Sequence, residues 1–291
     1  MIHFMKFRWL YFFFSGIVII PGIISLLLFR LKPGIDFTGG TELQLRIQPK
    51  EGQLSEDAVR SSLQGIEVSE LLMAGNTVTV KAKPVDVEQK DAALAVARRQ
   101  FLQVEEVYFE TVGPILGKEL LIKTMFAMLL SAGGITLYVA YRFKELKYGV
   151  CAVLAMLHDT LVLFGVFSIL GKFLGVEVDI LFVTAVLTIL SFSVHDTIVV
   201  YDRIRELRRK HSTTAYVDLV DTAVTETMSR SVNNSMTIIF MLFVLWLFGG
   251  ESMRWFLLAL LVGTVTGTYS STFTAAPLLV IWDDVARRKK K

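Results

Sequence analysis

Six stretches of this 291-residue sequence are apolar and long enough to cross a bilayer. The first runs from about Trp9 to Phe29. The other five lie at about 124–141, 148–170, 179–201, 232–248 and 255–282. A mean hydropathy of +0.56 is rare in soluble domains and common in polytopic membrane proteins. We therefore predict an α-helical polytopic membrane protein with six transmembrane helices.

The first apolar run is interpreted as a membrane helix that stays on the chain, not as a cleaved signal peptide. Its length, roughly twenty residues, is that of a spanning helix. No small-residue cleavage site follows it, because the next residues are Arg30–Pro33. Pro21 and Gly22 lie inside the run, where a membrane helix tolerates a kink. Residues 1–31 are assigned to a cytoplasmic N-terminus and the first span.

Residues 32–121 have the composition of a soluble α+β domain. Ser55 is a candidate N-cap for a short helix, and Asp86 with Gln89 forms a capping box for a helix to about Phe101. Strands are predicted at 42–47, 68–73, 77–83 and 104–112. The order β-α-β-β-α-β is ferredoxin-like, a fold with many functions. With no His, no Cys and no phosphate loop, the domain is predicted to be a binding or docking module.

The distribution of Lys and Arg predicts the orientation, because positive residues favour the cytoplasmic side. Counting spans places most basic loops on one side: Lys6, Arg8, Arg142, Lys144, Lys147, the cluster 203–210 and the tail 287–291. The opposite short loops hold only Lys172 and Arg254. We expect both termini and the segment 202–230 to be cytoplasmic. The domain 32–121 between the first two spans would then be external, and residues 122–286 would hold the other five spans.

Two His-Asp pairs lie inside apolar runs: His158 with Asp159 and His195 with Asp196. A charge at mid-membrane costs at least about 2.5–3.5 kcal/mol unless it is paired or wetted, so such residues are functional candidates. At about 1.5 Å per residue, Asp159 lies near mid-membrane and Asp196 nearer the cytoplasmic end. Arg230, at the start of the fifth span, is a candidate counter-charge for Asp196. These groups would form a proton relay, or alternatively static hydrogen-bonded links between helices.

Other classes of site find little support in the sequence. No HExxH, GxSxG or P-loop motif occurs, so no enzymatic activity, metal site or cofactor is predicted, and energy would come from a partner or an ion gradient. The single Cys151 excludes a disulfide within the chain. The basic tail is expected to anchor at the membrane, not to bind nucleic acid. Gly263 and Gly267 predict close helix packing in the last span.

Several stretches resemble the SecD/SecF family of protein-export membrane proteins. Residues 34–41, GIDFTGGT, contain Asp36, Phe37, Gly39 and Gly40 of the family signature, and residues 113–119, GPILGKE, contain Gly113, Pro114 and Gly117. Residues 193–206, 229–235 and 267–271 resemble motifs of the fourth, fifth and sixth spans of SecF members. These five motifs occur in family order and cover nearly the whole chain.

The resemblance implies a SecF-type subunit of the accessory Sec translocase, related to the RND transporters, in the cytoplasmic (inner) membrane. It implies SecD and the SecYEG translocon as partners, with YajC and YidC as further candidates, and an unfolded translocating protein as substrate. The implied energy source is the proton-motive force, with Na⁺ as the alternative coupling ion to H⁺. Asp196 and Arg230 match charged positions implicated in proton transport. His195 departs from the family, in which Asn is common before this Asp.

Three hypotheses follow. In the first, protonation of Asp196 from outside loosens its pairing with Arg230 and moves the external domain during protein export. In the second, the chain is part of an RND-like transporter of small molecules or lipids. In the third, it is a non-conducting scaffold of the translocon that docks through 202–228. Whether it is a separate SecF or the SecF half of a fused protein stays open.

Overall fold

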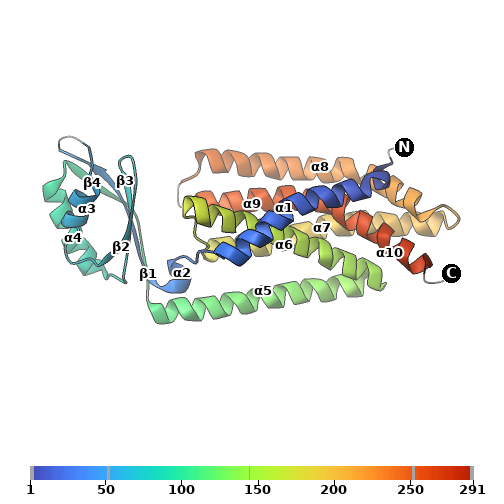
Figure 1. Cartoon of the computed structure of the whole chain (residues 1–291), viewed down its shortest axis with the longest axis horizontal. Helices are drawn as coiled ribbons and strands as arrows, with labels where there is room; N and C mark the ends of the chain where they lie inside the picture. Colours follow the sequence, from blue (N-terminus) through green and yellow to red (C-terminus); the bar gives the residue numbers. More distant parts are fainter. Residues whose placement is uncertain (1–2, 51–52, 144, 251–252, 289–291) are drawn as a thin grey trace. The chain divides into compact units, whose positions relative to one another are not determined.

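The computed structural model describes residues 3–50, 53–143, 145–250 and 253–288 (Figure 1). The chain forms two compact units, which are described separately. One comprises Met1–Lys32 with Ala127–Lys291, and the other comprises Pro33–Phe126. Within the described residues, six helical segments are long and apolar enough to cross a membrane. The prediction of six spans is confirmed at this level.

The long helices continue past the apolar stretches that predicted them. They are α1 (Arg8–Phe29, after the short η1, Phe4–Phe7), α5 (Pro114–Phe143), α6 (Leu146–Leu174), α7 (Ile180–Lys210), α8 (Tyr216–Phe248) and α9 (Arg254–Ser270), which continues through the π-helical η3 (Ser271–Ala275) into α10 (Ala276–Arg288). Helix α5 begins inside the predicted domain 32–121. The predicted polar segment 202–230 is helical except at 211–215, since α7 and α8 extend into it.

Helices α6 and α7 carry much of the buried core of the first unit. Helix α1 crosses α6 at Gly22 and Gly165, where a Cβ on Gly165 would lie 2.5 Å from the Gly22 Cα. Pro21 does not break α1. The predicted packing glycines lie against α7: a Cβ on Gly267 would lie 3.4 Å from the Ser193 Cα. These close approaches fix how the central helices are rotated relative to one another.

The second unit is a four-stranded antiparallel sheet in the order β2-β3-β1-β4, with α3 (Glu56–Ser62) and α4 (Val87–Gln100) on one face (Figure 1). The strands are β1 (Gly40–Gln48), β2 (Val68–Ala74), β3 (Thr77–Ala82) and β4 (Gln103–Val112). Alternate residues of β1 and β3 pack against α3 and α4. Ser55 caps α3, and Asp86 with Gln89 forms the predicted capping box of α4.

The family signature lies where the chain enters β1 and leaves β4. After α2 (Ile35–Thr38), Gly39 adopts φ +75° and ψ 155°, and a Cβ there would lie 2.7 Å from the Pro114 Cα. A Cβ on Gly117 would lie 2.9 Å from the Gly39 backbone nitrogen. Gly40 is also left-handed, with φ +143°. The two motifs therefore meet backbone to backbone, which only glycine permits at these positions.

Candidate functional site

Asp196 of α7 is buried among the long helices, with a relative exposure of 7%. The Ser231 hydroxyl of α8 lies 2.8 Å from Oδ1 and 2.7 Å from Oδ2, and the Ser271 hydroxyl of η3 donates to Oδ2. No ion pair to Asp196 occurs within the described part of the chain. A carboxylate held only by neutral hydroxyls can lose or gain a proton without breaking a salt bridge.

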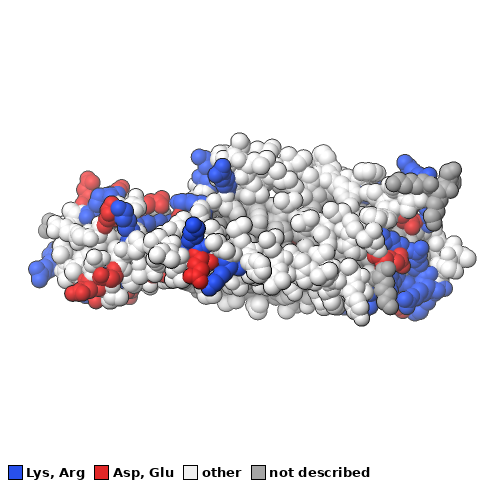
Figure 2. All heavy atoms as spheres, turned by 90° about the horizontal axis from the view of Figure 1, so that it is seen from below, with Lys and Arg blue, Asp and Glu red and all other residues white. Residues whose placement is uncertain are grey.

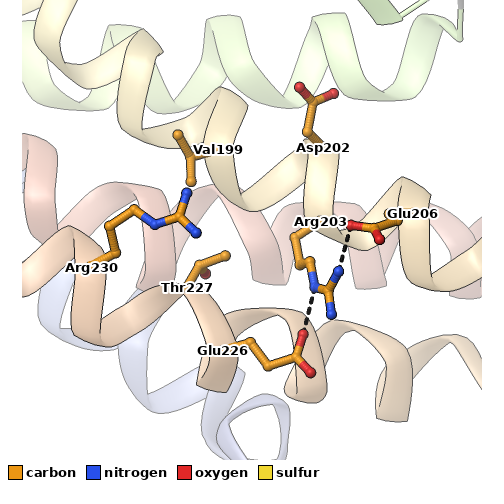
Figure 3. Close-up of a pocket in the computed structure, with 7 residues that line it drawn as sticks. All are labelled: Val199, Asp202, Arg203, Glu206, Glu226, Thr227 and Arg230. Carbon is orange, nitrogen blue, oxygen red and sulfur yellow. Dashed lines mark hydrogen bonds and ion pairs between the residues drawn. The ribbon is translucent and has the colours of Figure 1, made fainter.

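The predicted Asp196–Arg230 pair is not formed in the described residues, so this hypothesis is corrected. Ser231 is the residue that faces Asp196, and Arg230 precedes it by one position, about 100° around the helix. Arg230 is exposed and lines a pocket of about 480 Å³ between α7 and α8 (Figure 3). The other lining residues are Val199, Asp202, Arg203, Glu206, Glu226 and Thr227. In this pocket Arg203 binds Glu206 and Glu226.

The pocket reaches the level of Asp196 from the end of α7 that carries the basic cluster. Val199 lies three residues after Asp196, and Thr227 lies four before Ser231, so each is about one helical turn from the carboxylate site. In the view of Figure 2, Lys and Arg gather at this end of the bundle, whereas its sides are mostly uncharged.

A second carboxylate, Asp159 of α6, is even more deeply buried, with a relative exposure of 1%. Its Oδ1 lies 2.9 Å from the His158 Nδ1. Its Oδ2 accepts hydrogen bonds from Ser193 of α7 at 2.5 Å and from Ser270 of α9 at 2.6 Å. The His158 Nε2 lies 3.0 Å from the Ser15 hydroxyl of α1. The two carboxylates and their partners thus extend across the bundle from α1 to α8.

His195 does not join this network, although the sequence places it beside Asp196. It is exposed on the outer side of α7, in a row of exposed polar residues at spacings of three and four: Thr184, Thr188, Ser191 and His195. Helix α8 carries a similar exposed row: Arg230, Asn233, Asn234 and Thr237. The threonines of these rows donate to carbonyl oxygens of their own helices. His195 and Arg230 are the members that would be costly against lipid without a partner or water.

Sequence reasoning identified both carboxylates but missed the serines that hold them. Ser231, Ser270 and Ser271 lie in the motifs that resemble the family. A serine in a membrane helix usually donates to a carbonyl oxygen of its own helix or packs against a neighbouring helix, so these serines did not stand out as partners of a carboxylate. The only group with metal-ligand spacing in the described residues is His3, Asp218 and Asp221. Asp221 already accepts a hydrogen bond from the Met5 backbone N–H at 2.8 Å. We assign no metal to it.

Comparison with known proteins agrees with this architecture. The family model described as "Protein export membrane protein SecD/SecF, C-terminal" matches residues 93–285, and "SecD/SecF GG Motif" matches residues 24–51. The chain is 42% identical to protein translocase subunit SecF of Thermobaculum terrenum, over 98% of this chain and 95% of the relative. It is 39% identical to SecF of Synechocystis, over 86% and 82%.

Longer relatives match along part of their length. The chain is 34% identical to protein translocase subunit SecDF of Bacillus subtilis, covering 94% of this chain and 37% of that protein. A crystal structure of SecDF from Thermus, described as a translocon-associated membrane protein, superposes with a TM-score of 0.84 at 31% identity. It covers 97% of this chain, which spans 39% of the SecDF chain.

Fold and site together define a multi-pass membrane protein of six long apolar helices in which serine hydroxyls hold the buried carboxylates of Asp159 and Asp196. Given the matched family models and the near full-length relatives, the chain belongs to the SecD/SecF family.

Proposed function

We propose that this chain is a SecF-type subunit that assists protein export by using the proton-motive force, with Asp196 as its working carboxylate. The observation that carries the proposal is the environment of Asp196: buried, held by hydroxyls from two other helices, and about one turn from a pocket that contains Arg230. A carboxylate inside a membrane bundle that can change its charge is a component of proton transport.

We replace the hypothesis of a breaking Asp196–Arg230 salt bridge with one based on the serine hydroxyls that contact Asp196. When Asp196 is ionised, Ser231 and Ser271 tie α7 to α8 and to η3. When Asp196 takes up a proton, one oxygen becomes a donor and those hydroxyls lose an ionic acceptor, so the three helices are held less strongly. Arg230 places a positive charge in this pocket, whose lining also holds Arg203 and the three carboxylates of Asp202, Glu206 and Glu226. Protons are the proposed coupling ion, and Na⁺ is the alternative.

We place both termini on the cytoplasmic side of the inner membrane and the ferredoxin-like unit on the external side. The support is the basic cluster at the ends of α7 and α10, because positive residues favour the cytoplasm. Loosening of the bundle would then be passed through α1 and α5 to the external unit. That unit would contact the unfolded chain as it leaves the translocon.

The exposed polar rows of α7 and α8 are the proposed surface for the partner SecD. Relatives of this chain include single SecDF proteins more than twice its length, which supports a partner of similar kind beside it. Polar side chains within the bilayer find hydrogen bonds when another helix covers them. YajC and YidC are further candidate partners in the same translocon.

Secretion of a reporter protein tests the function, in cells whose only copy of the gene carries Asp196→Asn. We expect secretion to fall strongly while the levels of this chain and SecD stay normal. The control is Asp283→Asn, which removes a carboxylate paired with Arg287 on α10 and should leave secretion unchanged. Normal secretion with Asp196→Asn would refute the proposal and favour the scaffold. Loss of lipid or small-molecule export with normal secretion would favour the RND-like transporter.

A further inference from the structure

Two consecutive serines connect the two buried carboxylates. Ser270, the last residue of α9, donates to Asp159 of α6, and Ser271, the first residue of η3, donates to Asp196 of α7. Consecutive residues of a helix point about 100° apart, so one helix can reach two neighbours at one level. Because the two serines are adjacent in the backbone, a shift of this segment changes both hydrogen bonds.

Each serine also has a second acceptor on its own helix. The Ser270 hydroxyl lies 3.2 Å from the Gly267 carbonyl oxygen, and the Ser271 hydroxyl lies 3.1 Å from that of Thr268. A hydroxyl has one proton to donate, so it must favour one acceptor. An ionised carboxylate is the stronger acceptor, and a neutral one leaves the carbonyl to compete. The Ser270 and Ser271 hydroxyls can therefore respond to protonation of a carboxylate by rotating toward the carbonyl oxygens of their own helix.

The helix departs from α geometry at this same point. Residues Ser271–Ala275 form a π-helical turn, an irregularity frequent at functional sites. The Tyr201 hydroxyl of α7 donates to the Ala275 carbonyl at 3.0 Å. The buried hydroxyls of Thr197 and Thr274 lack a hydrogen-bond partner in the described part of the chain. Thr274 in the turn and Thr197 on the adjacent α7 can therefore form new hydrogen bonds when their neighbours change.

We propose that Asp159 is a second proton-carrying residue, coupled to Asp196 through Ser270 and Ser271. The inference rests on the proposed function and deepens it. On protonation, Asp159 Oδ2 binds the proton and the Ser270 hydroxyl turns to the Gly267 carbonyl oxygen. On release, the proton passes to the ionised Asp196 carboxylate and the Ser270 hydrogen bond to Asp159 re-forms.

The groups that face Asp159 are few. His158 lies on its own helix, Tyr269 of α9 stacks on the His158 ring, and Asp196 lies beyond the two serines. Two neighbouring buried carboxylates do not titrate independently, because a proton on one favours the charged form of the other. In this proposal a proton alternates between Asp159 on α6 and Asp196 on α7.

The test is infrared titration of the protonated carboxyl signals in the full chain with SecD in lipid vesicles. Subtracting the spectrum of the double variant Asp159→Asn with Asp196→Asn isolates the signal of Asp196 in Asp159→Asn and of Asp159 in Asp196→Asn. We expect each to bind its proton at least about tenfold less tightly when the other is neutral. The double variant Ser270→Ala with Ser271→Ala should reduce the coupling below about threefold.

The matched control is Thr264→Ala, which removes a buried hydroxyl of α9 that bonds only its own helix at Leu260. It should keep the full coupling. Equal proton affinities with and without the second carboxylate would overturn the proposal, as would full coupling in the double serine variant. If the double variant does not assemble, Ser270→Ala alone gives the same comparison. If proton binding at Asp159 and Asp196 is coupled but cells carrying Asp196→Asn still secrete normally, this inference stands and the proposed function is refuted.

Discussion

Replacing Gly39 by alanine tests the backbone contact in the family signature. The φ of +75° and ψ of 155° at Gly39 lie in a region almost confined to glycine, at a cost of about 1–3 kcal/mol for alanine. The new Cβ would also lie 2.7 Å from the Pro114 Cα, a backbone atom that cannot rotate away. Overpacking of this kind costs about 1–3 kcal/mol more. We expect Gly39→Ala to destabilise the second unit by about 2–6 kcal/mol.

Gly75 provides the matched control. It is also left-handed, with φ +61°, but nothing lies within 4 Å of its missing Cβ. Gly75→Ala should therefore cost only the conformational term, about 1–2 kcal/mol. Amide hydrogen exchange of the full chain in lipid vesicles measures both, because each 1.4 kcal/mol speeds exchange about tenfold where the unit opens. Equal acceleration of β1 and β4 by the two variants would refute the reasoning.

Two further predictions concern the long helices. Gly165→Ala would place a Cβ 2.5 Å from the Gly22 Cα, so we expect a loss of about 1–3 kcal/mol in thermal denaturation. Nothing lies within 4 Å of a Cβ added at Gly133, so Gly133→Ala should leave thermal stability unchanged or raise it. A larger loss of stability for Gly133→Ala than for Gly165→Ala would contradict the α1–α6 packing. His195→Trp should reduce co-purification of SecD, whereas Leu137→Trp on the exposed apolar side of α5 should not. Unchanged co-purification would exclude the α7 row as the SecD surface.

The sequence was most informative where structure depends on local chemistry. The Ser55 cap, the Asp86 capping box and the two strands on either side of Gly75 were predicted because neighbouring residues determine them. The six spans were predicted because length and apolarity are sufficient.

For the site around Asp159 and Asp196, the sequence predicted which carboxylates lie in the apolar helices but not which side chains face them. Asp159 and Asp196 could be found from the sequence because each is an ionisable residue within a long apolar run. The direction of a side chain around its helix follows from how helices pack, and apolar helices carry little amphipathic signal for that. This is why Arg230 was paired with Asp196 although Ser231 faces it, and why the exposure of His195 was missed. The π-helical turn Ser271–Ala275 was not predicted from the sequence.

Proton flux is the most direct test of the claim that the charge of Asp196 drives this protein. Vesicles containing the chain with SecD are given a proton gradient, and internal pH is followed with a trapped dye. The account predicts that Asp196→Asn reduces flux by on the order of a hundredfold or more relative to wild type, as expected when a side chain that transfers the proton is removed. Asp283→Asn should conduct normally. Equal flux in Asp196→Asn and wild type would contradict the account.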